Sequence, residues 1–568
     1  MHMTGLQTQI INHLDNIYPD SDNLLIAKKL VTAMGIDETN TETQTISTTD
    51  ENEIVLITYG DTIIDADMKP LEALSEFIEN KLHDIISTVH ILPFSPSSSD
   101  GGFSVIDYET VAPELGDWEL VDKVAPGKQN RKLMADLILN HGSAQSEWFQ
   151  QFLKNEEPGN KYYVTADPSK DLSDVTRPRT HDLLMQVTTP AGEQNVWCTF
   201  SHDQVDFDFS NPDVLVEFTK IINLYVSKGV TRLRLDAVAY LWKEIGTKCI
   251  HLPQTHEVVK LFNTLLKYRS PETLLISETN VPHEQNMSYF GDSDEAHVIY
   301  NFSLVPLVLH AVLASDVGPL NEWSQNLSLP AQNSYFLNFL ASHDGMGVRP
   351  AEGLLTDEQL NNLVKASEET GGTFSAYSSS GKDKPYELNA SLYDLLAGKD
   401  SKNIDRYILA HSILLTFIGI PAIYIHSLLG SPGDLEAVKH SKINRNINRS
   451  KINFNEIMAE LESPDSPRAS MFKKLCELVK IRRQQSAFHP DADQNTFSIE
   501  NTIFVIKRSS ADQDVYAIHN ISEHKYMIKS SDLSLNENES WHDLLGSQLD
   551  IEKPIELNRH QILWLSNK

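Results

Sequence analysis

Short apolar segments alternate with longer amphipathic segments along most of this chain. In the amphipathic segments the apolar residues recur at helical spacing, as over 214–227, 256–267 and 404–417. Eight strand–helix units in this order predict a parallel (β/α)8 barrel, the TIM barrel of the α/β class. The eight predicted strands are Ile54–Tyr59, Val89–Phe94, Leu133–Leu139, Arg232–Asp236, Leu274–Glu278, Val298–Phe302, Phe336–Leu340 and Ala422–His426.

Two connections between predicted strands are too long for a single helix. Residues 142–212 follow the third strand and residues 345–400 follow the seventh. Both predict small inserted domains, called B and B′ here, on the face of the barrel where active sites form. Domain B′ should hold a helix over 356–370 and then a Gly/Ser-rich loop, GGTFSAYSSSGKDKP, which leads to PYELN.

The two ends of the chain differ in pattern from the barrel. The first segment has helical spacing and ends in the polar run ETNTETQTISTTDENE, a predicted loop, whereas the last has short alternating strands such as TIFVIKRS and QILWLS. The predicted division is an N-terminal helical extension (1–50), barrel (51–141, 213–344 and 401–491), insertions (142–212 and 345–400) and a C-terminal antiparallel β domain (492–568).

Composition and charge narrow the class of protein. The 568 residues carry a formal net charge of -32, which argues against a nucleic-acid partner because phosphate backbones require basic patches. The lack of an apolar run of about 18 residues predicts no membrane span, and the N-terminus has no basic and apolar signal regions. The three cysteines lie far apart without metal-binding spacing, which predicts a cytoplasmic protein without disulfides.

Three carboxylates stand at the carboxyl ends of predicted strands. Asp236 and Glu278 end the fourth and fifth strands, and Asp344 follows the seventh. Because these ends share one face of a parallel barrel, the three side chains should lie close together. Arg234 lies on the same face of its strand as Asp236 and should keep that carboxylate ionised. The pattern suits glycosidic bond cleavage by two carboxyl groups, although Arg234 and Asp236 alone also suit a structural ion pair.

Four sequence blocks occur in a fixed order: ADLILNH (135–141), RLRLDA (232–237), ISETN (276–280) and SHDG (342–345). Together they resemble the blocks of the α-amylase superfamily, glycoside hydrolase family 13, and within it the sucrose phosphorylase-like subfamily. The resemblance implies that Asp236 is the nucleophile, oriented by Arg234, and that Glu278 is the general acid/base. It also implies that Asp344 holds sugar hydroxyls and that the histidines His141 and His343 hydrogen-bond the glucose.

Further blocks resemble the substrate-binding segments of the same subfamily. VTRPR (175–179) resembles a loop that brings an arginine toward phosphate, for which the planar guanidinium is well suited. The other blocks are SDGGFSVIDY (99–108), WCTFSHDQVD (197–206) and INRS (447–450). The implied substrate-binding residues are Asp100, Phe103, Arg179, Phe200, Gln204, Tyr240 and Arg449.

The segment PYELN (385–389) departs from the LYQVN-like segment of sucrose phosphorylases and places Tyr386 and Glu387 at the acceptor. RPAEGLLTDEQ, after SHDGMGV, departs as well. The chain as a whole is more similar to the subfamily members that act on glucosylglycerate. Glu387 alone would repel the glycerate anion and favour a neutral polyol, unless the arginines of TRPR, or Lys382 or Lys384, supply the opposing charge.

The resemblance implies a retaining α-glucoside phosphorylase that works through a covalent β-glucosyl-enzyme, with no metal or organic cofactor. The expected partners are a small-molecule α-glucoside and inorganic phosphate, with no nucleic acid and no membrane, and the enzyme should be a monomer or homodimer. The expected reaction converts 2-O-α-D-glucosylglycerate and phosphate reversibly into α-D-glucose 1-phosphate and D-glycerate. The alternatives are a glucosylglycerol or sucrose phosphorylase, a hydrolase or transglucosidase on the same fold, and a non-catalytic binding protein.

Overall fold

A computed structural model describes residues 5–37, 49–127, 130–179, 181–330, 333–379, 382–398, 403–535, 539–546, 550 and 552–568. The predicted polar loop after the N-terminal helices lies mostly outside these residues, and the side chain of Lys382 lies outside the described set as well.

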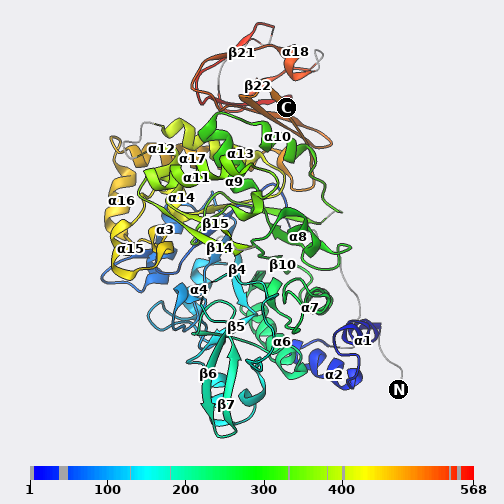
Figure 1. The fold of residues 1–568 in the computed structure, drawn as a ribbon. Helices are drawn as coiled ribbons and strands as arrows, with labels where there is room; N and C mark the ends of the chain where they lie inside the picture. The colour runs from blue at the N-terminus through cyan, green and yellow to red at the C-terminus, as the bar shows by residue number, and fades with distance from the viewer. Residues whose placement is uncertain are drawn as a thin grey trace.

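Eight parallel strands close into a barrel at the centre of the molecule, which confirms the predicted fold class (Figure 1). All eight predicted strands form, with ends that differ by one to a few residues from the predicted bounds. The strands are almost wholly buried, because barrel strands have side chains inside and helices outside, and this explains their continuous apolar sequences. In barrel order they are β1 (Val55–Thr58), β16 (Ile420–Tyr424), β12 (Tyr335–Asn338), β11 (Val298–Tyr300), β10 (Leu274–Ser277), β9 (Val230–Asp236), β4 (Lys132–Ile138) and β3 (Thr88–Ile91).

Amphipathic helices connect the strands and cover the barrel (Figure 1). Several begin with a side-chain cap, as where Asn211 accepts from the backbone N–H of Asp213 and Ser466 accepts from that of Ala469. The connecting helices include α3 (Pro70–Lys81), α6 (Pro212–Ser227), α7 (Pro253–Arg269), α9 (Leu304–Ala314), α13 (Ile404–Thr416) and α17 (Pro467–Arg482).

The N-terminal extension forms two helices, α1 (Gly5–Ile17) and α2 (Asn23–Met34), that lie against α7 and α6 (Figure 1). His13 on α1 lies 2.6 Å from a carboxylate oxygen of Glu257 and 3.0 Å from the hydroxyl of Thr264, both on α7. The apolar faces of both helices are buried, so the extension adds to the barrel's outer core.

The insertion after β4 carries a helix and two small antiparallel sheets. β5 (His141–Ser143) pairs with β8 (Gln204–Asp206), and between them lie α5 (Glu147–Lys154) and the hairpin of β6 (Leu184–Thr189) and β7 (Gly192–Trp197). The hairpin projects from the body of the molecule (Figure 1). Lys243 pairs with Asp206 at 2.7 Å and so ties the insertion to the segment that follows β9.

The insertion after β12 differs from the sequence prediction. The helix forms as α11 (Asp357–Glu369), but the segment predicted as a Gly/Ser-rich loop is a hairpin of β14 (Thr373–Ser379) and β15 (Lys382–Asn389). Tyr386 and Glu387 therefore lie on a strand. The local composition favoured a loop, but β15 also pairs with β13 (Met346–Gly347), and this distant partner stabilises the extended conformation.

The C-terminal segment forms the predicted antiparallel β domain, at one end of the molecule in Figure 1. One face of its main sheet has a core of its own, and the other packs on the barrel, where the indole N–H of Trp564 donates to Ser412 on α13 at 2.9 Å. The main sheet has the order β18 (Asp493–Ile499), β19 (Ile503–Ser509), β20 (Asp514–Asn520), β24 (Ile562–Ser566) and β22 (His542–Asp543), and β21 (Tyr526–Ile528) pairs with β23 (Ile555–Leu557).

Candidate active site

A cavity opens at the carboxyl ends of the barrel strands. Every predicted site residue except Arg234 and Arg449 lines it, and these two lie directly behind the lining. The lining consists of Asp100, Phe103, His141, Arg179, Phe200, Gln204, Asp236, Ala237, Ala239, Tyr240, Glu278, Thr279, Asn280, Val281, Phe302, His343, Asp344, Gly345, Tyr386, Glu387 and Arg445.

The register between β9 and β10 brings the first two carboxyls together. Leu235 pairs with Ser277, so Asp236 and Glu278 follow at adjacent strand ends. Arg234 lies between them, with Nη1 2.8 Å from Asp236 Oδ1 and Nη2 3.6 Å from Glu278 Oε2. The same guanidinium also pairs with the buried Asp136 on β4, so one cation serves three carboxyls.

This excess of negative charge determines the protonation of the pair. Burial, followed by the nearby carboxylates, raises the pKa of Asp236, and burial also raises the pKa of Glu278, in both cases against the opposing charge of Arg234. The effect of burial on Asp236 therefore opposes that of the guanidinium, which was the influence apparent from the sequence. The two carboxyls titrate together and retain one proton. Because Arg234 bonds directly to Asp236 and lies farther from Glu278, that proton belongs on Glu278.

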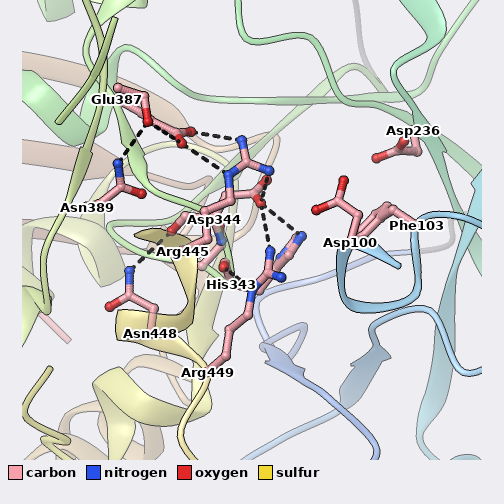
Figure 2. Close-up of polar contacts among 12 residues, drawn as sticks. Asp100, Phe103, Asp236, His343, Asp344, Glu387, Asn389, Arg445, Asn448 and Arg449 are labelled. Carbon is pink, nitrogen blue, oxygen red and sulfur yellow. Dashed lines mark hydrogen bonds and ion pairs between the residues drawn. The ribbon is translucent and has the colours of Figure 1, made fainter. Parts of the chain in front are cut away.

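Asp344 lies in a different charge environment. Arg445 Nη1 lies 2.7 Å from Asp344 Oδ1, and Arg449 Nη2 lies 3.5 Å from the same oxygen (Figure 2). Burial alone would raise the pKa of Asp344, but the charges of Arg445 and Arg449 hold it well below its ordinary value. Asp344 is therefore ionised and can accept hydrogen bonds.

Glu387 does not act as a free carboxylate. It is 3% exposed, and Arg445 grips it through Nε to Oε1 at 3.1 Å and Nη2 to Oε2 at 2.9 Å (Figure 2). Arg445 thus bridges Glu387 and Asp344. The opposing charge that Glu387 needs is therefore supplied by Arg445, a residue that was not among the candidates from the sequence.

One side of the cavity combines aromatic rings with polar groups. Phe103 stacks on His343 with ring centroids 4.9 Å apart and planes 6° apart. Gln204 donates to Asp100 at 3.2 Å and lies 3.1 Å from His141 Nε2. Burial lowers the pKa of His141 and lowers that of His343 to about 3, so both rings are neutral and can position hydroxyl groups.

Gly101 is required where this side meets Arg449. Its φ is +62°, and a Cβ there would lie 2.6 Å from Arg449 Nη1 and 2.7 Å from the hydroxyl of Tyr59. Arg449 in turn donates from Nε to the carbonyl of His343 at 2.9 Å. The glycine therefore allows the loop that carries Asp100 to approach the arginine that holds the Asp344 segment.

The outer end of the cavity carries Arg179. Its guanidinium lies 5.9 Å from the centre of the Phe200 ring, which meets Tyr240 edge-on at 5.4 Å. Arg177, two residues earlier, turns away and donates to the carbonyl of His181. Arg179 is therefore the arginine of this loop that can reach a ligand.

The sequence analysis missed several lining residues. Arg445 is the most important, because it joins Asp344 to Glu387. The repeat INRNINRS contains both Arg445 and Arg449, and the four-residue spacing could have suggested that both arginines face the same site. Others follow the ends of β10 and β11, a position that already marks site residues in a barrel: Thr279, Asn280, Val281 and Phe302.

Two further observations concern membranes and metal ions. Among the residues that the structure describes, none of the helices combines the length and apolar character needed to cross a membrane. Within the same residues, no three His, Cys, Asp or Glu side chains form an arrangement that could hold a metal ion.

Residues 82–346 match the family model described as alpha amylase, catalytic domain. The chain is 39% identical to the glucosylglycerate phosphorylase of Escherichia coli (strain K12), over 99% of this chain and 100% of that protein. It is 30% identical to the sucrose phosphorylase of Agrobacterium vitis, over 77% of this chain and 89% of that protein. The crystal structure of sucrose 6F-phosphate phosphorylase from Thermoanaerobacter thermosaccharolyticum matches with a TM-score of 0.73 and 26% identity, over 83% of this chain and 94% of that chain.

These matches define the class: the chain belongs to the α-amylase family, glycoside hydrolase family 13. Within that family it belongs with the glucoside phosphorylases related to sucrose phosphorylase.

Proposed function

We propose that this protein is a retaining α-glucoside phosphorylase that converts 2-O-α-D-glucosylglycerate and phosphate reversibly into α-D-glucose 1-phosphate and D-glycerate. The observation that carries the proposal is the pair of buried carboxyls, Asp236 and Glu278, that share Arg234 at the ends of adjacent strands. Relatives named glucosylglycerate phosphorylase are 39% and 42% identical over 99% and 84% of the chain, which supports this substrate.

In the first half-reaction a carboxylate oxygen of Asp236 attacks the anomeric carbon and forms an ester bond. The bond from that carbon to the glycerate oxygen breaks, and Glu278 delivers its proton to the departing oxygen. Arg234 holds Asp236 in position from the side of the barrel interior. Asp344, ionised between two arginines, binds sugar hydroxyls while the ring distorts.

In the second half-reaction a phosphate oxygen attacks the anomeric carbon from the side that glycerate left. The ester bond to Asp236 breaks, and the proton of the attacking phosphate passes to Glu278, which is now ionised. Two inversions give glucose 1-phosphate with the original α configuration. The enzyme returns to its starting protonation state.

The charge of the acceptor end supports glycerate over a neutral polyol. Glu387 is neutralised by Arg445, so it no longer argues for glycerol, and Arg179 adds a positive charge at the outer end. Both nucleophiles of the proposed reaction, phosphate and glycerate, are anions. A site that serves them in turn needs such a cation.

The test is the reverse reaction with glucose 1-phosphate and D-glycerate, glycerol or fructose as acceptor, followed by phosphate release. Glycerate should give the largest kcat/KM by a factor on the order of 10⁴, as sites built for one polar group discriminate. A larger value for glycerol or for fructose would move the protein to the glucosylglycerol or sucrose branch. Phosphate release that no acceptor accelerates would make it a hydrolase.

We further propose that the enzyme works in the cytoplasm as a monomer or homodimer, without a metal or organic cofactor. Its three cysteines are buried and free, as is usual for proteins of reducing compartments. The proposed chemistry uses only carboxyl groups, arginines and the two substrates.

A further inference from the structure

The arginines around the cavity divide into two groups by their partners. Arg234, Arg445 and Arg449 each lie within ion-pair distance of a carboxylate. Arg179 and Arg349 are different, because within the described ranges of the chain neither has a carboxylate at that distance. The arginines at the inner end are therefore paired with carboxylates, whereas Arg179 and Arg349, at the outer end, are uncompensated by a direct carboxylate partner within the described residues. The carboxylate of Glu352 is linked to Arg349 through the hydroxyl of Tyr377.

Arg349 is held at the outer wall by the segment that follows Asp344. The backbone N–H of Val348 donates to the carbonyl of Tyr386 at 3.0 Å, which fixes the segment against β15. The guanidinium lies 5.1 Å from the ring centre of Tyr377, and that ring meets the ring of Tyr386 at 6.3 Å. Because Tyr386 lines the cavity, the rings of Tyr377 and Tyr386 lie between Arg349 and the cavity on this side.

Tyr240 connects Arg349 to the cavity. This tyrosine lines the cavity, and its hydroxyl interacts with Arg349. Burial raises the pKa of Tyr240, while the charges of Arg349 and Arg179 oppose that shift and Glu278 adds to it. Tyr240 therefore lies among both uncompensated arginines and the proposed acid/base.

The donor groups of Arg349 are only partly used. In the part of the chain that the structure describes, its Nε is buried and has no hydrogen-bond partner. A buried donor without a partner is unfavourable unless a ligand or water satisfies it. The side chain as a whole is half-buried, so Arg349 keeps part of its surface accessible.

We propose that Arg349, together with Tyr240, binds the carboxylate of the acceptor and so determines the preference for an anionic acceptor. This inference rests on the proposed function. In glucosylglycerate the carboxylate is attached to the carbon that bears the glycosidic oxygen, so it must lie just beyond the oxygen that Glu278 protonates. Tyr240 lines the cavity together with Glu278, Arg349 contacts the hydroxyl of Tyr240, and its planar guanidinium can bind a carboxylate through two N–H groups.

The test compares three acceptors of similar shape, D-glycerate, D-glyceramide and glycerol, with glucose 1-phosphate as donor. Arg349→Gln should lower kcat/KM for glycerate by about 10- to 100-fold, the size of one hydrogen bond to a charged group, mainly through KM. Its kcat/KM for glyceramide and glycerol should change less than about threefold, because neutral acceptors do not use the charge. Arg349→Lys should recover part of the glycerate activity.

Lys384→Gln is the matched control, since Lys384 is an exposed cation on β15 of the same hairpin. This substitution should leave kcat/KM unchanged for all three acceptors. The inference is overturned if Arg349→Gln lowers kcat/KM equally for all three acceptors, because Arg349 would then only support Tyr377. It is also overturned if Lys384→Gln, and not Arg349→Gln, lowers kcat/KM for glycerate. A wild-type enzyme that prefers glycerol would contradict the proposed function itself, before any variant is made.

Discussion

Arg234 is the residue on which the proposed chemistry depends, although it does not line the cavity. Its guanidinium bonds to Asp236, lies near Glu278 and pairs with Asp136, and its plane also lies over the ring of Tyr300 at 5.4 Å. Asp136 has a second partner, His90, at 2.7 Å, so the charge of Arg234 is left to Asp236 and Glu278, and burial raises the pKa of both. The acid and the nucleophile therefore differ in protonation because they differ in distance to the same arginine.

Asp236→Asn should abolish glucosyl transfer to every acceptor. The amide cannot form the ester bond, so kcat should fall by several orders of magnitude, on the scale seen when catalytic nucleophiles are removed. The measurement is the initial rate of glucose 1-phosphate formation, with mass spectrometry to verify that the preparation contains only asparagine. Turnover close to that of the wild type would remove Asp236 from the role of nucleophile.

Arg179→Ala should weaken the use of phosphate more than the use of water. Arg179 is a fixed cation at the outer end of the cavity, so its loss should raise KM for phosphate by about 10-fold or more. Arg177→Ala is the matched control, because that side chain turns toward the carbonyl of His181. If phosphate saturation were the same in Arg179→Ala and wild type, Arg179 would be an ordinary surface arginine.

Among the elements, the barrel strands could be predicted well and the second insertion could not. The strands are buried on both faces, so their sequences are short apolar runs that stand out from the amphipathic helices. β14 and β15 are hydrogen-bonded to each other, and β15 also pairs with β13, which is distant in the sequence, although their own residues include the serines and the proline of a loop. Tertiary pairing therefore decided a structure that local composition did not indicate.

Contacts between distant segments also decide which site residues could be predicted from the sequence and which could not. The acids Asp236, Glu278 and Asp344 could be predicted because each follows a strand, and strand ends converge in a barrel. The role of Arg445 could not, because its contact with Glu387 joins a 3-10 turn to a strand 58 residues away. A charge that looks free in the sequence is neutralised by a partner that only the fold reveals.

The helices α1 and α2 should contribute to stability and leave catalysis unchanged. Leu14 on α1 is fully buried, and Leu14→Ala should cost about 2–5 kcal/mol of unfolding free energy. Leu25→Ala on α2 is the control, because Leu25 is 52% exposed and its loss should cost little. Thermal unfolding and kcat/KM should be measured on both. A large drop in kcat/KM with an unchanged unfolding midpoint would show that the extension serves the active site.

At the scale of the whole molecule, the fold gathers acids from strands far apart in the sequence into one buried cavity, and this should determine the pH dependence. Burial raises the pKa of Glu278, so the acid form persists above the ordinary carboxylate range and is lost as the pH rises through the raised pKa. At low pH the rate falls when Asp236 also takes a proton. The value of kcat/KM for glucosylglycerate should therefore be bell-shaped in pH.

A comparison of two glucosyl donors can show whether Glu278 or another titrating group causes the alkaline fall in kcat/KM. With α-glucosyl fluoride the leaving group needs little protonation, so the alkaline fall in kcat/KM should be much weaker than with glucosylglycerate. Glu278→Gln should likewise retain more activity on the fluoride. An alkaline fall of the same size on both donors would assign it to a group other than Glu278.

In the proposed reaction phosphate, and not water, takes the glucosyl group from Asp236. This can be measured by following glucose 1-phosphate and free glucose separately while the wild-type enzyme consumes 2-O-α-D-glucosylglycerate at increasing phosphate concentrations. Glucose 1-phosphate should form with saturable dependence on phosphate, and glucose should remain a minor product. Glucose formed as the main product, at a rate independent of phosphate, would contradict the proposed reaction.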